Sequence, residues 1–192
     1  MLPPTCIIAC SVFKPALEYL GIEEKYPQVC TTFLPSNLHL QPTELKENLL
    51  REIKAAKRRY KRTVCLYGDC FPGIEGFCKN QGTIKVPGLH CFEMLLGGER
   101  YQRIIAEVAG TYFLERELIQ NFRLYCLEPL ELFDEEMRKW FFECYQRVVY
   151  VRQPTDPDLV LRASQLAEFL HLTLEIRDAD YTYLNRVITG LI

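Results

Sequence analysis

Two stretches of sequence decide the fold class: Thr63-Val64-Cys65-Leu66-Tyr67-Gly68-Asp69-Cys70 and Thr83-Ile84-Lys85-Val86-Pro87-Gly88-Leu89-His90-Cys91. Each begins with a short apolar run that is typical of a buried strand and ends in a glycine-containing turn. A helical pattern follows each turn, and strands that alternate with helices form a mainly parallel sheet. The two stretches therefore predict an α/β fold in which Cys70, His90 and Cys91 follow strand ends.

The rest of the chain continues this alternation. A strong helix is expected from Pro42, because proline suits the first turn and apolar residues then recur at helical spacing. Ser11 is expected to cap a helix after the first strand, Pro72 to lie in the first turn of the helix after Cys70, and Asp134 to cap a later helix. Strands are expected at residues 5–10, 28–34, 64–67, 83–86, 111–114, 148–151 and 172–176. We predict one α/β domain over residues 1–192, with helices flanking the sheet.

A short internal echo bears on the domain organisation. Residues 60–64 and 145–149 share the pattern Tyr-x-Arg-x-Val where a helix gives way to a strand. Two similar Rossmann-like halves, 1–109 and 110–192, with a cleft between them would explain the echo. A single continuous sheet with a chance match is the alternative.

Composition and charge narrow the classes of partner. The 192 residues are 48% hydrophobic, which is enough for a substantial core, and the net charge of −2 gives no general attraction to nucleic acid or anionic membranes. The apolar N-terminal stretch is broken by Pro3 and Pro4 and contains Lys14 and Glu18, so it is expected to be a strand and a helix. We expect a cytoplasmic protein whose partner is a small molecule or a metallocofactor protein, not nucleic acid or a membrane.

The nine cysteines fall into two groups. An odd number of thiols in a reducing compartment does not indicate a disulfide framework. Core or structural roles are expected for six of them, which lie within strands or beside helices: Cys6, Cys30, Cys65, Cys78, Cys126 and Cys144. Cys10, Cys70 and Cys91 differ, because each follows a strand and precedes a helix.

The carboxyl ends of parallel strands meet at one edge of a sheet, so these three thiols are expected to share a site with His90. A helix N-terminus should also lower the pKa of each thiol and favour the thiolate. The predicted metal ligands are Cys10, Cys70, His90 and Cys91. They suit a zinc ion, an iron–sulfur cluster, or an open site that a substrate completes. Because His90 and Cys91 are adjacent, only one of them is expected to bind the ion directly.

A thiol-dependent transferase or hydrolase is the alternative function. Cys70 would be the nucleophile, His90 the acid or base, and Asp69 the group that orients the imidazole. Asp69 could equally serve as a helix cap. In the enzyme hypothesis Cys70 should be alkylated selectively at mildly acidic pH.

Four short stretches carry a family resemblance: Ile7-Ile8-Ala9-Cys10, Tyr67-Gly68-Asp69-Cys70, Val86-Pro87-Gly88-Leu89-His90-Cys91-Phe92-Glu93 and Gly110-Thr111-Tyr112-Phe113-Leu114. Their order and spacing resemble an uncharacterised prokaryotic family, domain of unknown function 1638. The resemblance places the family's strand-end positions on Cys10, Cys70, His90 and Cys91, and implies a link to corrinoid-dependent methyl transfer in anaerobes. Phe71-Pro72-Gly73-Ile74 departs from the family's more glycine-rich turn, which puts in doubt a close backbone approach to a ligand there.

Overall fold

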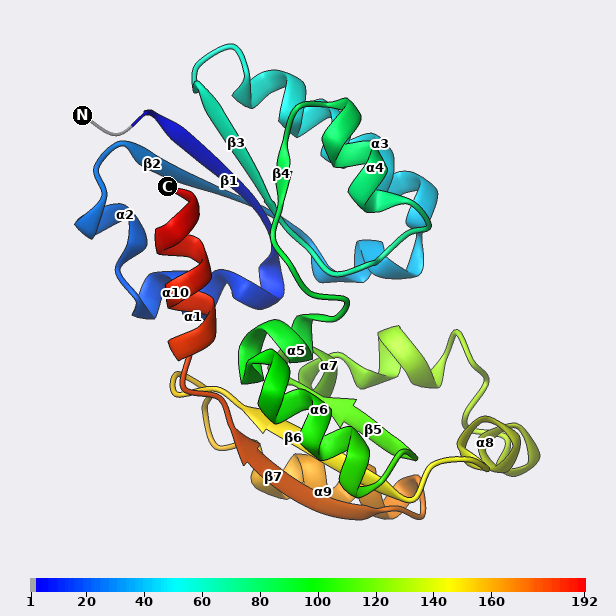
Figure 1. Ribbon diagram of the computed structural model, residues 1–192. Helices are drawn as coiled ribbons and strands as arrows, with labels where there is room; N and C mark the ends of the chain where they lie inside the picture. Colours follow the sequence, from blue (N-terminus) through cyan, green and yellow to red (C-terminus); the bar gives the residue numbers. More distant parts are fainter. Residues whose placement is uncertain (1–2) are drawn as a thin grey trace. The chain divides into compact units, whose positions relative to one another are not determined.

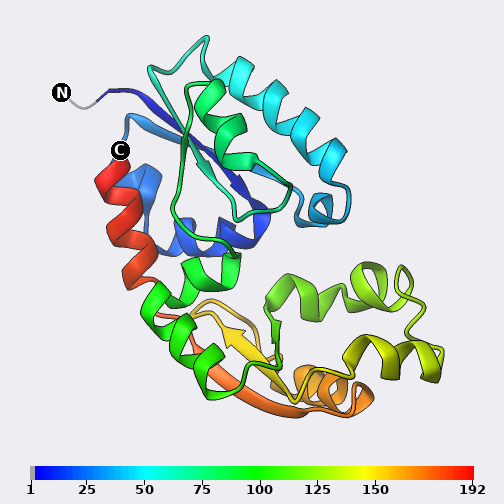
Figure 2. The same cartoon turned by 45° about the vertical axis from the view of Figure 1, so that its right-hand side comes forward.

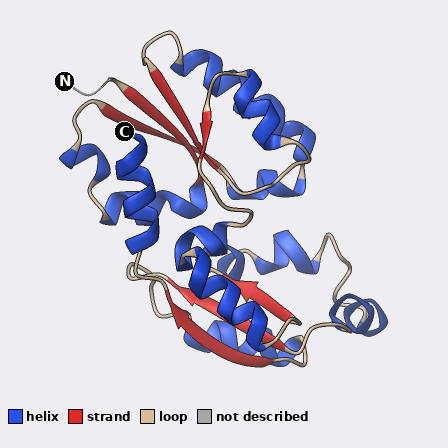
Figure 3. Ribbon diagram, viewed as in Figure 1, coloured by secondary structure: helices blue, strands red, loops and turns tan. Residues whose placement is uncertain are grey.

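The computed structural model describes residues 3–192 and divides the chain into two compact units. Unit 1 contains the chain up to Met94 together with Tyr181–Ile192, and unit 2 contains Leu95–Asp180. Each unit has its own parallel sheet flanked by helices, as the separate groups of strands in Figure 3 show. The predicted α/β class is confirmed, and the strands form two sheets, so the single continuous sheet is not what this chain adopts.

The unit 1 sheet has the strand order β2-β1-β3-β4, with every pair parallel. Its strands are β1 (Thr5–Cys10), β2 (Val29–Leu34), β3 (Arg62–Leu66) and β4 (Ile84–Lys85). The chain moves outward from β1 to β2 and then returns past β1 to β3. The strand order therefore reverses between β1 and β3, and ligands of open α/β sheets bind outside the carboxyl ends of the strands at such a point.

Helices cover both faces of this sheet (Figures 1 and 2). The helical elements of unit 1 are η1 (Ser11–Phe13), α1 (Lys14–Tyr19), α2 (Ile22–Lys25), η2 (Ser36–Leu40), α3 (Pro42–Ala56), α4 (Ile74–Asn80) and α10 (Thr182–Leu191), and α5 (Cys91–Leu96) begins in unit 1. Helices α3 and α4 lie on one face, and α1, α2 and α10 lie on the other.

Helix α3 shows how the sequence builds this core. Pro42 opens the helix, and Leu45, Leu49, Ile53 and Ala56 are buried against the sheet, as their spacing predicted. The helix ends at Ala56, and Tyr60, which lies beyond it, is partly buried and packs against the same core cluster. On the sheet side the cluster includes Cys6, Ile8, Cys65 and Tyr67, which alternate along β1 and β3 and its continuation.

The unit 2 sheet has the order β5-β6-β7, again fully parallel. Its strands are β5 (Thr111–Leu114), β6 (Arg147–Arg152) and β7 (Thr173–Asp178), and its helices are α6 (Gly98–Glu107), α7 (Arg116–Gln120), the π-helical turn η3 (Arg123–Leu127), α8 (Glu135–Phe142) and α9 (Val160–Phe169). Asp134 caps α8 as predicted, because its carboxylate accepts hydrogen bonds from the N–H groups of Glu136 and Met137 at 2.8 and 3.1 Å.

The echo in the sequence corresponds to a shared backbone corner. Thr5 is in register with Arg62 in unit 1, and Thr111 is in register with Arg147 in unit 2. In both units one carbonyl accepts two consecutive N–H groups: those of Lys61 and Arg62 at Pro4, and those of Gln146 and Arg147 at Gly110. The boundary between the units falls after Met94, and the last helix belongs to unit 1, whereas the expected halves met at residues 109 and 110.

Candidate functional site

Cys10 and Cys70 lie at the point of unit 1 where the strand order reverses. Cys10 is the last residue of β1, and Cys70 follows β3 by four residues. Both are partly buried and pack against the core cluster under α3 and α4. The structure therefore places two of the predicted ligands at the carboxyl ends of adjacent strands, as the alternation of strands and helices suggested.

The turn after β3 is held directly against the turn that carries His90. The N–H of Asp69 donates to the carbonyl of Leu89 at 2.7 Å. A Cβ atom on Gly68 would lie 2.5 Å from that carbonyl oxygen and 3.1 Å from the Cα of His90. Only glycine allows this approach without a backbone shift, so Gly68 brings the predicted turns together.

His90 and Cys91 begin α5, the helix expected from Cys91. The N–H of Met94 donates to the carbonyl of His90 at 3.2 Å, and the carboxylate of Glu93 accepts the N–H of Leu89 at 2.8 Å. His90 is exposed and Cys91 is half-buried. All four predicted ligands therefore belong to unit 1, with His90 and Cys91 on the turn that touches Gly68.

Lys85 is a charged residue of this region that the sequence analysis did not select. Its ammonium lies 3.2 Å from the carboxylate of Asp69 and donates to the carbonyl of Gly88 at 2.9 Å, although only 9% of its side chain is exposed. Asp69 was expected to orient His90 or to cap a helix, and the structure shows its carboxylate paired with Lys85. Lys85 could have been identified from the sequence, because it is a charged residue inside the predicted strand 83–86.

The expected low pKa of Cys70 is wrong. Burial raises the pKa of this thiol, the nearby positive charge of Lys85 opposes that rise, and the negative charge of Asp69 adds to it. Helix α4 begins only at Ile74, after Pro72, so Cys70 is not at its N-terminus. The reason is Phe71, which is buried in the core and draws the chain inward before the helix can start.

The cap expected from Ser11 is also wrong. No side chain caps the short helix η1 or the helix α1 that follows it. The Ser11 hydroxyl instead accepts the N–H of Ser36 at 3.0 Å and thereby ties the ends of β1 and β2 together.

Tyr67, like Lys85, is a residue of this region for which no role was predicted. It follows the last residue of β3 and is 1% exposed, and its hydroxyl has no hydrogen-bond partner among the described residues. Burial raises its pKa, and the thiols of Cys10, Cys65 and Cys70 raise it further. The phenol therefore remains protonated and can donate a hydrogen bond. Tyr67 and Cys65 belong to the core cluster against which Cys10 and Cys70 pack.

The other thiols occupy different places. Cys65 on β3 and Cys78 on α4 are fully buried and hydrogen-bond to each other, and this bond raises the pKa of Cys65. Cys30 lies near the start of β2, at the opposite edge of the sheet from Cys10. Within residues 3–192, no three His, Cys, Asp or Glu side chains are grouped so that they could hold a metal ion. A closed site with four protein ligands is thus not preassembled in this structure.

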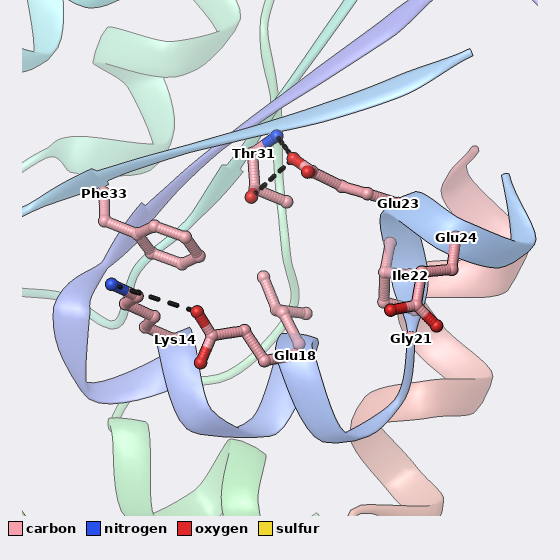
Figure 4. A pocket seen from close by; sticks show the side chains of 9 residues that line it. Lys14, Glu18, Gly21, Ile22, Glu23, Glu24, Thr31 and Phe33 are labelled. Carbon is pink, nitrogen blue, oxygen red and sulfur yellow. Dashed lines mark hydrogen bonds and ion pairs between the residues drawn. The ribbon is translucent and has the colours of Figure 1, made fainter. Parts of the chain in front are cut away.

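Figure 4 shows a cavity of unit 1 that lies elsewhere, between β2 and the helices α1 and α2. Its volume is about 370 Å³. Lys14 lies 3.8 Å from Glu18, and Glu23 accepts hydrogen bonds from the backbone and hydroxyl of Thr31, the latter at 2.7 Å. Glu23 thereby covers an N–H group on the outer edge of the sheet, which is a structural role.

Unit 2 carries carboxylates where unit 1 carries thiols. Glu115 follows β5, is buried, and accepts the N–H groups of Glu117 and Leu118 at 2.8 and 2.7 Å. Burial raises its pKa to about 7 despite these hydrogen bonds. On the next strand, the hydroxyl of Tyr150 donates to Asp156 at 2.7 Å. Glu115 thus caps α7, and one oxygen of Asp156 closes the loop after β6, while its other oxygen is buried without a hydrogen-bond partner among the described residues.

Comparisons with known proteins identify a family but no characterised relative. None of the helices in the described part of the chain is both long and apolar enough to cross a membrane. Neither the curated proteins nor the solved structures contain a match to this chain. A family model does match, over residues 33–188, which include Cys70, His90 and Cys91. The chain therefore belongs to DUF1638, a family of proteins of unknown function.

Proposed function

We propose that this protein binds a thiophilic metal ion, or a metallocofactor that supplies most of its own ligands, at the carboxyl edge of the unit 1 sheet. Cys10 and Cys70 would be the thiolate ligands. The observation that carries the proposal is their position at the ends of β1 and β3, where both thiols act on the buried hydroxyl of Tyr67. This is the place in an open parallel sheet where ligands bind.

The proposal is for an open site. Because no three potential ligands are grouped in the described residues, the ion would keep positions for ligands that are not side chains, as catalytic zinc sites do. His90 and Cys91 lie on the turn in contact with Gly68, and neither belongs to a group of three potential ligands among the described residues. An iron–sulfur cluster, which is held by several thiolates, suits this arrangement less well than a single zinc ion does.

The raised pKa of Cys70 favours metal binding over nucleophilic catalysis. A thiol that burial keeps protonated is a poor nucleophile at neutral pH, because the thiolate is the reactive form. A metal ion supplies its own positive charge and displaces the proton on binding. The thiol-dependent enzyme, with Cys70, His90 and Asp69 as its residues, is therefore the second candidate.

A corrinoid is one form of metallocofactor that fits the proposal. Its macrocycle supplies most of the cobalt's ligands, so a site with one or two protein ligands would suffice. The link to methyl transfer rests on the family resemblance alone, and the experiment that follows does not depend on it.

Titration with Co²⁺ under anaerobic, reducing conditions tests the proposal. We expect about one Co²⁺ per chain, with a thiolate-to-cobalt charge-transfer band in the near ultraviolet. Cys10→Ser and Cys70→Ser should each weaken binding at least tenfold, on the order of 1.4 kcal/mol, because each removes one of two thiolates. Cys30→Ser is the matched control, since this partly buried thiol lies at the other edge of the same sheet and should leave the titration unchanged.

The proposal fails if wild-type protein gives no thiolate band with stoichiometric Co²⁺. It also fails if Cys30→Ser weakens binding as much as Cys10→Ser and Cys70→Ser do. Equal losses from His90→Ala or Cys91→Ser would show that the neighbouring turn joins the site.

A further inference from the structure

Tyr67 carries the one polar group of the thiol site whose hydrogen bonding is unexplained. Its side chain is 1% exposed, and its hydroxyl has no hydrogen-bond partner among the described residues. Buried polar groups are nearly always hydrogen-bonded in native proteins, so an unsatisfied one in a core calls for a specific explanation.

Other buried phenols of this chain are satisfied. The hydroxyl of Tyr150 in unit 2 donates to Asp156 at 2.7 Å, and the hydroxyl of Tyr112 lies 3.4 Å from the sulfur of Cys126. Phenylalanine would fill the same volume at position 67 without a polar atom to satisfy. The hydroxyl of Tyr67 thus has no structural role within the described residues.

The surroundings of the hydroxyl point to a ligand. The groups that act on it are the thiols of Cys10, Cys65 and Cys70, and the Cys65 thiol is already hydrogen-bonded to Cys78. Cys10 and Cys70 are the thiolates of the proposed metal site. Tyr67 belongs to the core cluster against which both of these thiols pack, so its side chain lies on the same side of the sheet as the proposed ligands.

The cation that acts on Cys70 favours a negatively charged ligand. The ammonium of Lys85 acts on the thiol of Cys70, and its side chain is largely buried, whereas half of the Asp69 carboxylate that partly offsets it is exposed to solvent. A protonated phenol has one O–H donor, and an anionic oxygen is a good acceptor for it.

We propose that the hydroxyl of Tyr67 donates a hydrogen bond to an anionic oxygen ligand of the metal, such as a carboxylate, and so selects what completes the open site. This inference rests on the proposed function. Tyr67 would be a specificity-determining residue of the site and not a metal ligand.

Acetate binding to Co²⁺-loaded protein tests the inference. Acetate should change the visible d–d spectrum of wild-type protein with saturation, and Tyr67→Phe should raise the acetate Kd about tenfold while leaving the thiolate-to-cobalt band in place. Tyr150→Phe is the matched control, because it removes a buried hydroxyl from unit 2 and should leave the acetate Kd unchanged.

Thermal unfolding of the metal-free proteins gives a second readout that does not need the metal. Tyr67→Phe should unfold at the same or a higher temperature than wild type, since it removes an unsatisfied polar atom, and Tyr150→Phe should unfold at a lower one. A lower melting temperature for Tyr67→Phe would overturn the inference, because the hydroxyl would then have a partner inside the protein.

The outcomes separate the two proposals. If wild-type protein does not bind Co²⁺, both the proposed function and this inference are overturned. Normal Co²⁺ binding combined with an unchanged acetate Kd in Tyr67→Phe overturns only the inference.

Discussion

Units 1 and 2 share a backbone corner but differ in the chemistry at both ends of their sheets. At the corner, Thr5 and Arg62 correspond to Thr111 and Arg147 in register and in backbone hydrogen bonding. At the carboxyl edge, unit 1 presents thiols and a phenol without a hydrogen-bond partner among the described residues. Unit 2 presents carboxylates that cap α7 and close the loop after β6, although one oxygen of Asp156 is also buried without such a partner. The comparison teaches that the same parallel-sheet scaffold can carry different chemistry, because the residues at the strand ends distinguish the two units.

The two arginines of the corner also differ. In unit 2, the buried guanidinium of Arg147 donates to the carbonyl of Ile104 at 2.6 Å, to the hydroxyl of Thr111 at 2.9 Å and to the carboxylate of Glu175 at 2.9 Å. In unit 1, Arg62 is half-buried and donates to the carbonyl of Leu191 at the end of α10. Of the two corner arginines, only Arg147 in unit 2 is part of a buried polar network.

Replacing these arginines should have the largest effect on the free energy of unfolding. The loss should be larger for Arg147 than for Arg62. Arg147→Ala leaves buried acceptors without their donor, and we expect a loss of about 3 kcal/mol in the free energy of unfolding. Arg62→Ala should cost roughly 1 kcal/mol, because it loses one neutral acceptor at a partly solvated position. Urea unfolding followed by circular dichroism measures both, and equal losses would contradict the distinction between the units.

Glu115 should make the stability of unit 2 depend on pH. Its folded-state pKa of about 7 lies above the ordinary value of 4.5, so the folded protein holds this proton more tightly than the unfolded chain. Its contribution is therefore fully present below pH 4.5 and is lost as pH rises to 7, by roughly 3 kcal/mol in all. Ala9 occupies the corresponding position of unit 1 and has no such dependence.

Glu115→Gln measures this effect. The variant should remove most of the fall in stability between pH 5 and pH 8, as followed by urea unfolding at the two values. A wild-type protein that became more stable over this interval, or a variant with the same slope as wild type, would show that Glu115 ionises normally.

The sequence was most informative where local and tertiary preferences agree. The proline at the start of α3, the apolar spacing of that helix and the first strand, which ends at Cys10, were predicted correctly, because amphipathic patterns reflect burial directly. The strand expected over residues 64–67 is present as Arg62–Leu66. The start of α4 was misplaced, since Phe71 packs into the core and Pro72 remains outside the helix. Burial of a neighbouring side chain in the core therefore outweighed the preference of proline for the first turn of a helix.

The position of Cys10 and Cys70 after strand ends was predicted, and the predicted set of metal ligands stays a prediction. The strand-end rule located Cys10 and Cys70, but no pattern shows that Gly68 allows the His90 turn to touch its neighbour or that burial raises the pKa of Cys70. No role was predicted for Tyr67 or Lys85. In a strand-like stretch, an aromatic residue is typical of the core and a lysine is typical of a sheet edge. Their roles depend on contacts between segments far apart in the chain.

The variant Gly68→Ala should distinguish an effect on the stability of the fold from an effect on the proposed metal site. Its Cβ atom would lie 2.5 Å from the carbonyl oxygen of Leu89, so the two turns must move apart, at a cost of about 2 kcal/mol in stability and with weaker Co²⁺ binding. Gly110→Ala makes a similar clash with Cys144 in unit 2 and should destabilise the protein without affecting Co²⁺ binding. Unchanged Co²⁺ binding in Gly68→Ala would argue that the turn is not part of the site.

The smallest expected effect is a difference in thiol reactivity. At pH 7, iodoacetamide should label Cys70 at least tenfold more slowly than the exposed Cys144, because burial raises the pKa of Cys70 and restricts access. Peptide mass spectrometry over time gives both rates. Cys70 as the first thiol labelled would restore the nucleophile hypothesis.

X-ray absorption at the metal edge tests the central claim most directly, because it counts the sulfur atoms bound to the metal. For protein loaded with one Zn²⁺ per chain, we predict two sulfur ligands near 2.3 Å, a typical zinc–thiolate distance, with lighter atoms completing the sphere. Cys10→Ser and Cys70→Ser should each reduce the sulfur count by one, and Cys30→Ser should not. A first shell without sulfur in the wild-type protein would contradict the account.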